Sequence, residues 1–258
     1  MYQSNPVAVA QLWTLLSKRL ATAGLAGVPA KPQWPTDFHA HWLQPGLLLS
    51  QACGYPLVAV LGENVQVVGA FQYNVPGCEG VIQRSQVVVR ADDPCAALAD
   101  LRGRRVAFNG TDSQSGYNSL RALLAPLARD GHFFGSRLVT GTHAESVKSV
   151  RDGKADVAAI DCVSLAGFRR YAPDVVQGVR VLTETAAYPG LPLITAAGTD
   201  NTVLALLRQV LGQLMHDPAA ASPLHDLFIT GFEALDFQDY QACAVMRDSA
   251  MAMHYPAL

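Results

Sequence analysis

A run of small polar residues follows a short apolar stretch near the middle of the chain. Residues 106–117, Val-Ala-Phe-Asn-Gly-Thr-Asp-Ser-Gln-Ser-Gly-Tyr, predict a strand, a polar loop and the start of a helix. Ser113, Gln114 and Ser115 then fall in the first helical turn, whose backbone N–H groups have no partners within the helix and lie at the positive end of its dipole. With two serine hydroxyls and the close approach that Gly116 permits, this junction suits a tetrahedral oxyanion such as phosphate or phosphonate. A serine here could equally well cap the helix and bind no ligand.

A second polar junction lies further along the chain. Thr142 and His143 follow a predicted strand at 137–140 and begin a predicted helix, and Ser146 belongs to the first turn of that helix. A histidine ring N–H at a helix N-terminus can donate a hydrogen bond to an anion. Taken alone, a histidine that hydrogen-bonds only within its own loop is the simpler interpretation.

Asp161 ends a third apolar stretch, the predicted buried strand at 157–160. Ligands of open α/β sheets usually bind at the carboxyl ends of the strands, where this carboxylate could accept a hydrogen bond from a ligand amine. The same residue could cap the helix that follows. The local sequence leaves both roles open.

The elements that must position these residues alternate between strands and helices along the chain. This alternation predicts an α/β fold with mostly parallel sheets. Two segments rich in strand ends and proline, 87–93 and 184–192, are candidates for crossings between two lobes. We therefore expect one lobe to be formed by residues 1–88 together with 190–258, and the other by residues 89–189.

The composition limits the classes of function. Of 258 residues, 50% are hydrophobic and 16% are charged, which is enough apolar material for packed cores. A net charge of -2 argues against a broad nucleic-acid interface. No apolar run is long enough to cross a membrane, and the first 20 residues resemble an amphipathic helix rather than a secretion signal. Five scattered cysteines make a poor disulfide framework, although one bridge between Cys53 and Cys78 would be compatible with an oxidising compartment.

Taken together, the two polar junctions resemble the substrate-binding proteins of phosphonate, phosphite and phosphate ABC transporters. The resemblance rests on Asp112-Ser-Gln-Ser-Gly-Tyr117, on Gly141-Thr-His-x-x-Ser146, and on Gly153-Lys-Ala-Asp-Val-Ala-Ala-Ile-Asp161. It implies the two-lobed periplasmic-binding-protein type II fold, in which each lobe is a mostly parallel sheet flanked by helices and two hinge crossovers join the lobes. It also implies that a small oxyanion is held by these residues of the two junctions: Ser113, Gln114, Ser115, Thr142, His143 and Ser146.

The resemblance implies further features of the site and of the protein's surroundings. Tyr55, in Cys-Gly-Tyr-Pro, matches an aromatic residue that lines the ligand cleft, and Asp161 resembles a carboxylate that can receive a ligand's ammonium group. The expected partners are a small-molecule oxyanion and the membrane subunits of a transporter, with no cofactor, no nucleic acid and no membrane insertion. The protein would be periplasmic if a leader is removed upstream. Otherwise it would be cytoplasmic, and a cytoplasmic sensor on the same fold is then the alternative function.

The chain also departs from the family pattern. Where many relatives have Tyr-x-Ser before the first crossover, this chain has Gln83-Arg-Ser85, so one aromatic wall of the cleft would be missing. The opening strand expected before the first helix is absent or reduced to Met1-Tyr2.

Two other classes of function stay open at this stage. In an enzyme, Cys53, His143 and Asp161 could serve as nucleophile, base and orienting group, and related folds do host enzymes. Motifs that would favour this interpretation, such as G-x-S-x-G, H-E-x-x-H or a phosphate-binding P-loop, are absent from the sequence. In an interaction domain the cleft would be empty or degenerate. The seven histidines are dispersed and show no metal-ligand spacing.

Overall fold

The computed structural model describes residue 2 and residues 5–258, and the chain divides into two compact units. Unit 1 contains residues 1–74, 78–82 and 189–240, and unit 2 contains residues 75–77, 83–188 and 241–258. The two-lobed α/β class expected from the sequence is confirmed. The division itself differs from the expected one at two places. Residues 75–77 and 83–88 belong to unit 2, so the first crossing precedes the expected segment 87–93. The C-terminal residues 241–258 also belong to unit 2, because Tyr255 and Leu258 are buried in its core.

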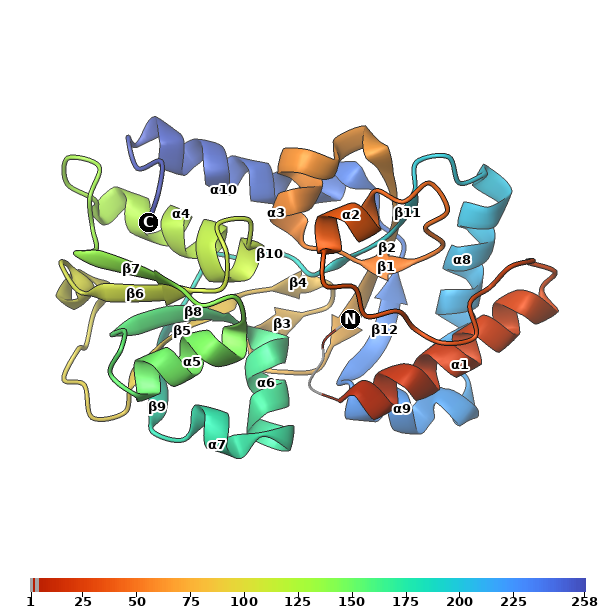
Figure 1. The fold of residues 1–258 in the computed structure, drawn as a ribbon, viewed down its shortest axis with the longest axis horizontal. Helices are drawn as coiled ribbons and strands as arrows, with labels where there is room; N and C mark the ends of the chain where they lie inside the picture. Colours follow the sequence, from red (N-terminus) through yellow and green to blue (C-terminus); the bar gives the residue numbers. More distant parts are fainter. Residues whose placement is uncertain (1, 3–4) are drawn as a thin grey trace. The chain divides into compact units, whose positions relative to one another are not determined.

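Short strands and helices are interspersed along the chain, although four strands follow one another between residues 65 and 90 (Figure 1). The helices are α1 (Pro6–Thr22), α2 (Phe38–Trp42), α3 (Gly54–Pro56), α4 (Ser119–Leu124), α5 (His143–Arg151), α6 (Cys162–Tyr171), α7 (Pro173–Val176), α8 (Asn201–Leu214), α9 (Ala221–Asp226) and α10 (Gln241–Ala252). The strands are β1 (Ser50–Gln51), β2 (Val65–Tyr73), β3 (Cys78–Glu79), β4 (Ile82–Gln83), β5 (Ser85–Arg90), β6 (Arg105–Phe108), β7 (Ser136–Val139), β8 (Val157–Asp161), β9 (Val179–Glu184), β10 (Tyr188–Pro189), β11 (Pro192–Ala196) and β12 (Ile229–Glu233).

Unit 2 is built around a five-stranded sheet of order β7-β6-β8-β5-β9. Strand β6 runs parallel to β7 and β8, whereas β5 runs antiparallel to β8 and β9. Helices α4 and α10 cover one face and α5, α6 and α7 cover the other (Figure 1). Alternate residues point to opposite faces of a strand, and the two cores follow this period. Val87 and Val89 of β5 join Leu120 of α4 in one core, while Val88 joins Val147 of α5 in the other.

Unit 1 contains a four-stranded sheet of order β1-β11-β2-β12, and each recorded pairing among its described strands is antiparallel. The expectation of mostly parallel sheets therefore fails for this unit. Strand β11 lies between β1 and β2, so neighbours in the sheet are not neighbours in the chain, and alternation along the sequence does not specify their direction. A third sheet, of order β10-β4-β3, consists of short strands.

Several local expectations are also corrected. The helix expected at 117–130 is interrupted: a π-helical turn (Gln114–Asn118) precedes α4, and a 3₁₀ turn (Ala125–Leu127) follows it. The expectation of a reduced opening strand concerns Met1, which lies outside the described residues, and α1 begins at Pro6 with Asn5 as its cap. Cys53 and Cys78 are not joined by a disulfide. Within the described part of the chain, no helix is long and apolar enough to span a membrane.

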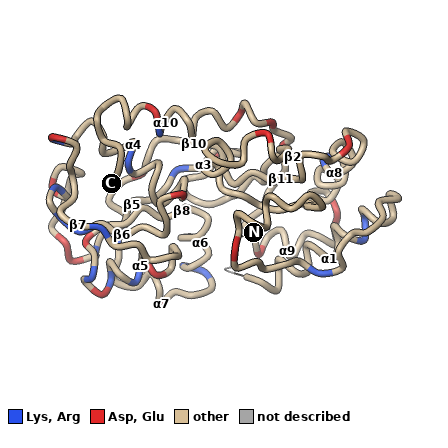
Figure 2. The backbone as a smooth tube through the Cα atoms, turned by 45° about the horizontal axis from the view of Figure 1, so that its top comes forward, with Lys and Arg blue, Asp and Glu red and all other residues tan. Residues whose placement is uncertain are grey.

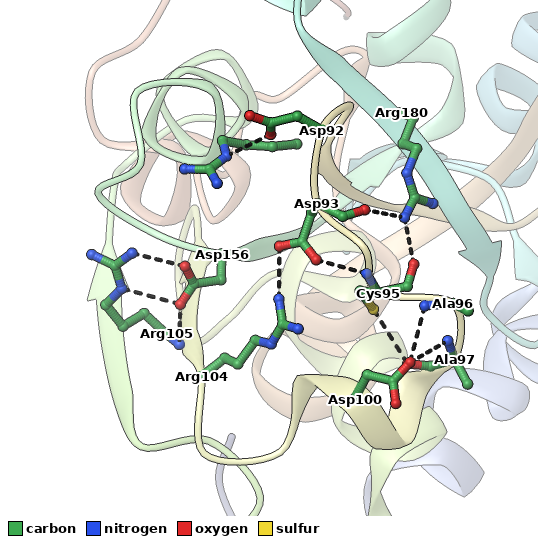
Figure 3. A network of polar contacts seen from close by, with 11 residues as sticks. Asp92, Asp93, Cys95, Ala96, Ala97, Asp100, Arg104, Arg105, Asp156 and Arg180 are labelled. Atoms are coloured by element: carbon green, nitrogen blue, oxygen red, sulfur yellow. Dashed lines mark hydrogen bonds and ion pairs between the residues drawn. The ribbon is translucent and has the colours of Figure 1, made fainter.

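A polar network holds together the strand ends of unit 2 where β6 and β8 begin (Figure 3). Asp156 accepts hydrogen bonds from the backbone N–H, Nε and Nη2 of Arg105, at 2.8, 3.1 and 2.7 Å. Asp93 accepts from Arg104 at 2.7 Å, and Arg180 donates to the carbonyl oxygens of Asp93 and Cys95. Because β6 and β8 are parallel, this network fixes their amino ends and leaves their carboxyl ends available for a site.

Candidate functional site

The three parallel strands of unit 2 end at one edge of its sheet, and the polar junctions follow directly from them. Asn109 follows β6, Gly141 follows β7, and Asp161 is the last residue of β8. The Gly141 N–H donates to the Asn109 carbonyl oxygen at 3.0 Å, which holds the two loops together. Gly141 has φ +83°, a left-handed conformation that favours glycine. The fold thus brings both predicted junctions to the same edge.

The serine segment forms a capped π-helical turn. The Ser113 hydroxyl accepts a hydrogen bond from the Gly116 N–H at 3.0 Å, and the Asn118 N–H donates to the Ser113 carbonyl at 2.9 Å. Ser113, Ser115 and Gly116 are buried. Single π turns are frequently found at functional sites. Both interpretations of Ser113 as a cap and as part of a site are therefore compatible with this turn.

The side chain of Asn109 leaves room for no residue larger than glycine at position 116. A Cβ built on Gly116 would lie 2.0 Å from Oδ1 of Asn109, far inside van der Waals contact. The space that the sequence analysis assigned to a ligand is thus filled by Asn109. This Oδ1 is buried and has no hydrogen-bond partner among the described residues.

His143 meets the serine turn. Its Nε2 lies 2.9 Å from the hydroxyl oxygen of Ser115. Helix α5 is capped by the Thr142 hydroxyl, which accepts from the Glu145 N–H at 3.1 Å, so His143 sits at the first position of that helix. Burial lowers the pKa of His143 below the usual histidine value of 6.5, although the negative charge of Asp161 acts in the opposite direction. The imidazole is accordingly neutral at neutral pH.

The second ring nitrogen of His143 bears on the enzyme interpretation. Nδ1 is buried and has no hydrogen-bond partner within residue 2 and residues 5–258. Asp161 is buried and caps α6, since its Oδ1 accepts from the Ser164 N–H at 2.7 Å. A base that is oriented by a carboxylate, as in a catalytic triad, would need a hydrogen bond to Nδ1. His143 and Asp161 are thus not joined as base and orienting group in this structure.

Other predicted site residues have different surroundings. The Gln114 side chain is buried against α10, where its Nε2 donates to the Met246 sulfur at 3.2 Å. The Ser146 hydroxyl lies 2.6 Å from that of Thr140, beneath the start of α5. Tyr55 is partly buried in unit 1. The structure therefore brings Ser113, Ser115 and His143 together, with the charge of Asp161 nearby.

Sequence reasoning missed several polar residues around the serine turn. Asn109 was inside the segment but carried no distinguishing signal. Ser119 is four residues after Ser115, a spacing that places both on one side of a helix and could have indicated it. Ser85 and Tyr188 are 103 positions apart and meet only in the folded unit.

Two cavities are lined by residues of unit 1 and by none of the candidate site residues. Acidic and basic residues are spread over many elements instead of gathering on one (Figure 2). A cavity of about 200 Å³ lies within unit 1, between α1 and the β1–β11 region, and Trp13, Trp34 and Leu47 are among its lining residues. None of the candidate site residues lines it.

Comparisons with known proteins agree with this fold. The family described as "ABC transporter, phosphonate, periplasmic substrate-binding protein" matches residues 56–240. The comparison with curated proteins returned no match.

Solved structures share the fold at low sequence identity. A binding protein component of an ABC phosphonate transporter from Pseudomonas aeruginosa is 14% identical with a TM-score of 0.76, covering 98% of this chain and 85% of that chain. PhnD1 from Prochlorococcus marinus, in complex with methylphosphonate, is 15% identical with a TM-score of 0.75 and coverages of 95% and 93%. XAC2383 from Xanthomonas citri, bound to ATP, is 19% identical with a TM-score of 0.69 and coverages of 96% and 95%.

The family match spans well over half of the chain and includes both polar junctions. The solute-binding role expected from the sequence is thereby confirmed. The chain belongs to the family of periplasmic substrate-binding proteins of phosphonate ABC transporters.

Proposed function

We propose that this protein binds a phosphonate or phosphate group at the first turns of the Gln114–Asn118 segment and of α5. The observation that carries the proposal is the 2.9 Å contact between Ser115 Oγ and His143 Nε2, which joins two helix starts at one sheet edge. Amide groups at helix starts stabilise an anion through their unpaired N–H donors and the helix dipole. Ser113, Ser115 and His143 supply the side-chain donors.

The remaining candidate residues have weaker support. Asp161 lies close enough to act electrostatically on His143, which suits a residue facing a cationic part of the ligand. Thr142 would hold the first turn of α5 in place, because its hydroxyl caps that helix. Gln114 and Ser146 would stabilise the two turns through their hydrogen bonds to Met246 and Thr140. We also propose Tyr55 as a ligand-binding residue, because Cys-Gly-Tyr-Pro resembles the aromatic position of the family.

The solved relatives support phosphorus chemistry without settling the organic part. One is described in complex with methylphosphonate and another bound to ATP, and both ligands carry tetrahedral phosphorus oxyanions. We therefore propose a ligand that carries a tetrahedral phosphorus oxyanion, the group common to these two ligands. We further propose that the protein closes around the ligand by a hinge motion, resides in the periplasm and delivers its ligand to the membrane subunits of a transporter.

We also propose that the ligand leaves chemically unchanged. A serine and a histidine at hydrogen-bond distance could act as nucleophile and base, but the unpartnered Nδ1 argues against an oriented base. Phosphorus-31 NMR of methylphosphonate and of a phosphate monoester, incubated with the protein, would show unaltered resonances. The appearance of inorganic phosphate with wild-type protein and its absence with Ser115→Ala would contradict this part of the proposal.

A thermal-shift series tests the ligand class. Methylphosphonate and phosphate should raise the melting temperature, because a ligand at 100 times its Kd stabilises the folded state by about 2.7 kcal/mol. Ser115→Ala and His143→Ala should lose most of this shift. Ser136→Ala and His132→Ala are matched controls, since both residues are exposed and lie outside the site. The proposal fails if no phosphorus oxyanion shifts wild-type protein, or if all four variants respond alike.

A further inference from the structure

A chain of buried hydroxyl groups runs from Tyr188 to the serine turn within unit 2. The Tyr188 hydroxyl lies 2.6 Å from the Ser85 hydroxyl, and the Ser85 hydroxyl lies 3.2 Å from that of Ser119. The Ser119 hydroxyl donates to the carbonyl oxygen of Ser115 at 2.9 Å. All four residues are buried, with exposed fractions of 3% for Tyr188, 0% for Ser85, 1% for Ser119 and 7% for Ser115.

One arrangement of protons satisfies all three contacts. Each hydroxyl carries a single proton, and that of Ser119 is used on a carbonyl oxygen, which can only accept. Ser119 must then accept from Ser85, and Ser85 must accept from Tyr188. The chain is therefore directed from Tyr188 toward Ser115, and hydrogen bonds aligned in this way strengthen one another in a buried setting.

The chain of hydroxyl groups begins at a point where the polypeptide passes from one unit to the other. Tyr188 is the last residue of the long unit 2 segment 83–188, and Ser85 is its third residue. Their backbones are also connected, because the Ser85 N–H donates to Thr185 Oγ1 at 3.0 Å and the Thr185 N–H donates to the Ser85 carbonyl at 2.9 Å. Both ends of this segment are thus tied to each other and, through Ser119, to the turn that carries Ser115.

We infer that Tyr188, Ser85 and Ser119 are positioning residues for oxyanion binding, which hold the Ser115 carbonyl and thereby aim the Ser115 hydroxyl at His143. The inference rests on the proposed function, since it concerns the same site. None of the three needs to contact the ligand. Removing the Tyr188 hydroxyl would leave the Ser85 hydroxyl without its donor. The hydrogen bonds of Ser85 and Ser119 would then weaken, and the Ser115 carbonyl would be held less firmly.

The test compares Tyr188→Phe, Ser119→Ala and their double variant with wild-type protein, using methylphosphonate titrated calorimetrically. Each single change should weaken binding about 3- to 10-fold, the usual worth of one buried hydrogen bond. The double variant should be no more than about 2-fold weaker than the weaker single variant, because both changes break the same chain. Ser119→Thr, which keeps the hydroxyl, should bind like wild type, and Tyr171→Phe is the matched tyrosine control. Unchanged affinity in both single variants, or fully additive losses, would overturn the inference.

Hydrogen exchange in the ligand-free protein separates this inference from the proposed function. Amides 116–119 should exchange faster in Tyr188→Phe and Ser119→Ala than in wild type or Tyr171→Phe. If wild-type protein binds no phosphorus oxyanion, the proposed function fails, and this exchange result still tests the positioning chain. Equal protection of these amides in all proteins would overturn it, and Ser119→Ala alone gives the answer if Tyr188→Phe does not fold.

Discussion

At the residue scale, the site depends on polar groups that the protein itself leaves incompletely satisfied. Asn109 Oδ1 and His143 Nδ1 are both buried without a partner in the described chain, and both adjoin the serine turn. Buried polar groups are nearly always hydrogen-bonded, and an exception costs about 1–3 kcal/mol. Two such exceptions beside one turn are typical of a place where function outweighs stability.

Gly116→Ala tests the packing of the serine turn. The new methyl group would collide with Asn109 Oδ1, so either the turn or Asn109 must move. We expect oxyanion affinity to fall at least about 10-fold, because displacing donors by even an ångström costs that much. Calorimetric titration measures the change. The double variant Gly116→Ala/Asn109→Gly, which removes the obstacle, should recover part of the affinity, and an unaltered affinity in Gly116→Ala would contradict the geometry.

His143 gives the stability of unit 2 a defined pH dependence. Burial lowers the pKa of His143 in the folded state, so the unfolded chain binds a proton at a higher pH than the folded chain does. The contribution of the buried neutral His143 ring to folding stability is complete above the usual histidine pKa of 6.5. This contribution decreases as the pH falls from 6.5 toward the lowered pKa of the folded state. Urea unfolding at pH 7.5 and pH 5.5 should show wild type losing more stability than His143→Gln. Equal losses would show that His143 is not buried as a neutral ring.

At the element scale, the strands and helices of unit 2 were largely predictable, and their pairings were not. The valine run 87–89 and the glycine stop at Gly153 indicate elements directly from the sequence. The π turn at Gln114–Asn118 was not predictable, because it depends on Asn109 and on the hydroxyl of Ser119. Antiparallel β5 and β11 were missed because strand direction follows from chain crossings rather than from side-chain pattern.

Asp156→Asn tests whether the amino ends of β6 and β8 are held independently of the site. The Arg105 guanidinium holds the pKa of Asp156 below its ordinary value through their hydrogen bonds, although burial opposes this. The variant should melt about 2–4 °C lower, the shift expected for a loss near 1 kcal/mol in a protein of this size. Its affinity for methylphosphonate should be unchanged, since the network lies at the opposite ends of the strands (Figure 3). A weaker affinity with an unchanged melting temperature would contradict this separation.

At the scale of the whole molecule, two lobes were evident from the sequence, but the position of the first crossing and the path of the C-terminus were not. The last helix joins unit 2 through buried contacts: the Asn118 amide donates to the Cys243 carbonyl at 2.9 Å, and Arg121 donates to the Pro256 carbonyl at 2.6 Å. Both are contacts between residues far apart in the sequence, and no local sequence pattern predicts them. They also place the C-terminal residues behind the serine turn, so the end of the chain supports the site.

Tyr255 allows the anchoring of the C-terminus to be tested. Burial raises the pKa of its phenol to about 12, and the hydroxyl has no partner in the part of the chain that the structure describes. The pKa of Tyr255 in the folded state lies above the unfolded value near 10. The contribution of the buried neutral phenol to folding stability is therefore complete below about pH 10, and it is lost as the pH rises toward 12. Tyr255→Phe should be as stable as wild type at pH 8 and more stable than wild type at pH 11 by chemical denaturation. A variant that loses stability at pH 8 would show that the hydroxyl is hydrogen-bonded.

The central claim is that Ser115 and His143 act together as a receptor for a phosphorus oxyanion. Calorimetric titration of methylphosphonate into wild type, Ser115→Ala, His143→Ala and the double variant tests it most directly. We expect saturable binding at one site in wild type. The loss of affinity in the double variant should differ clearly from the sum of the single losses, because the two side chains contact each other at 2.9 Å. Absence of binding by wild type to methylphosphonate and phosphate alike, or retention of wild-type affinity in the double variant, would contradict it.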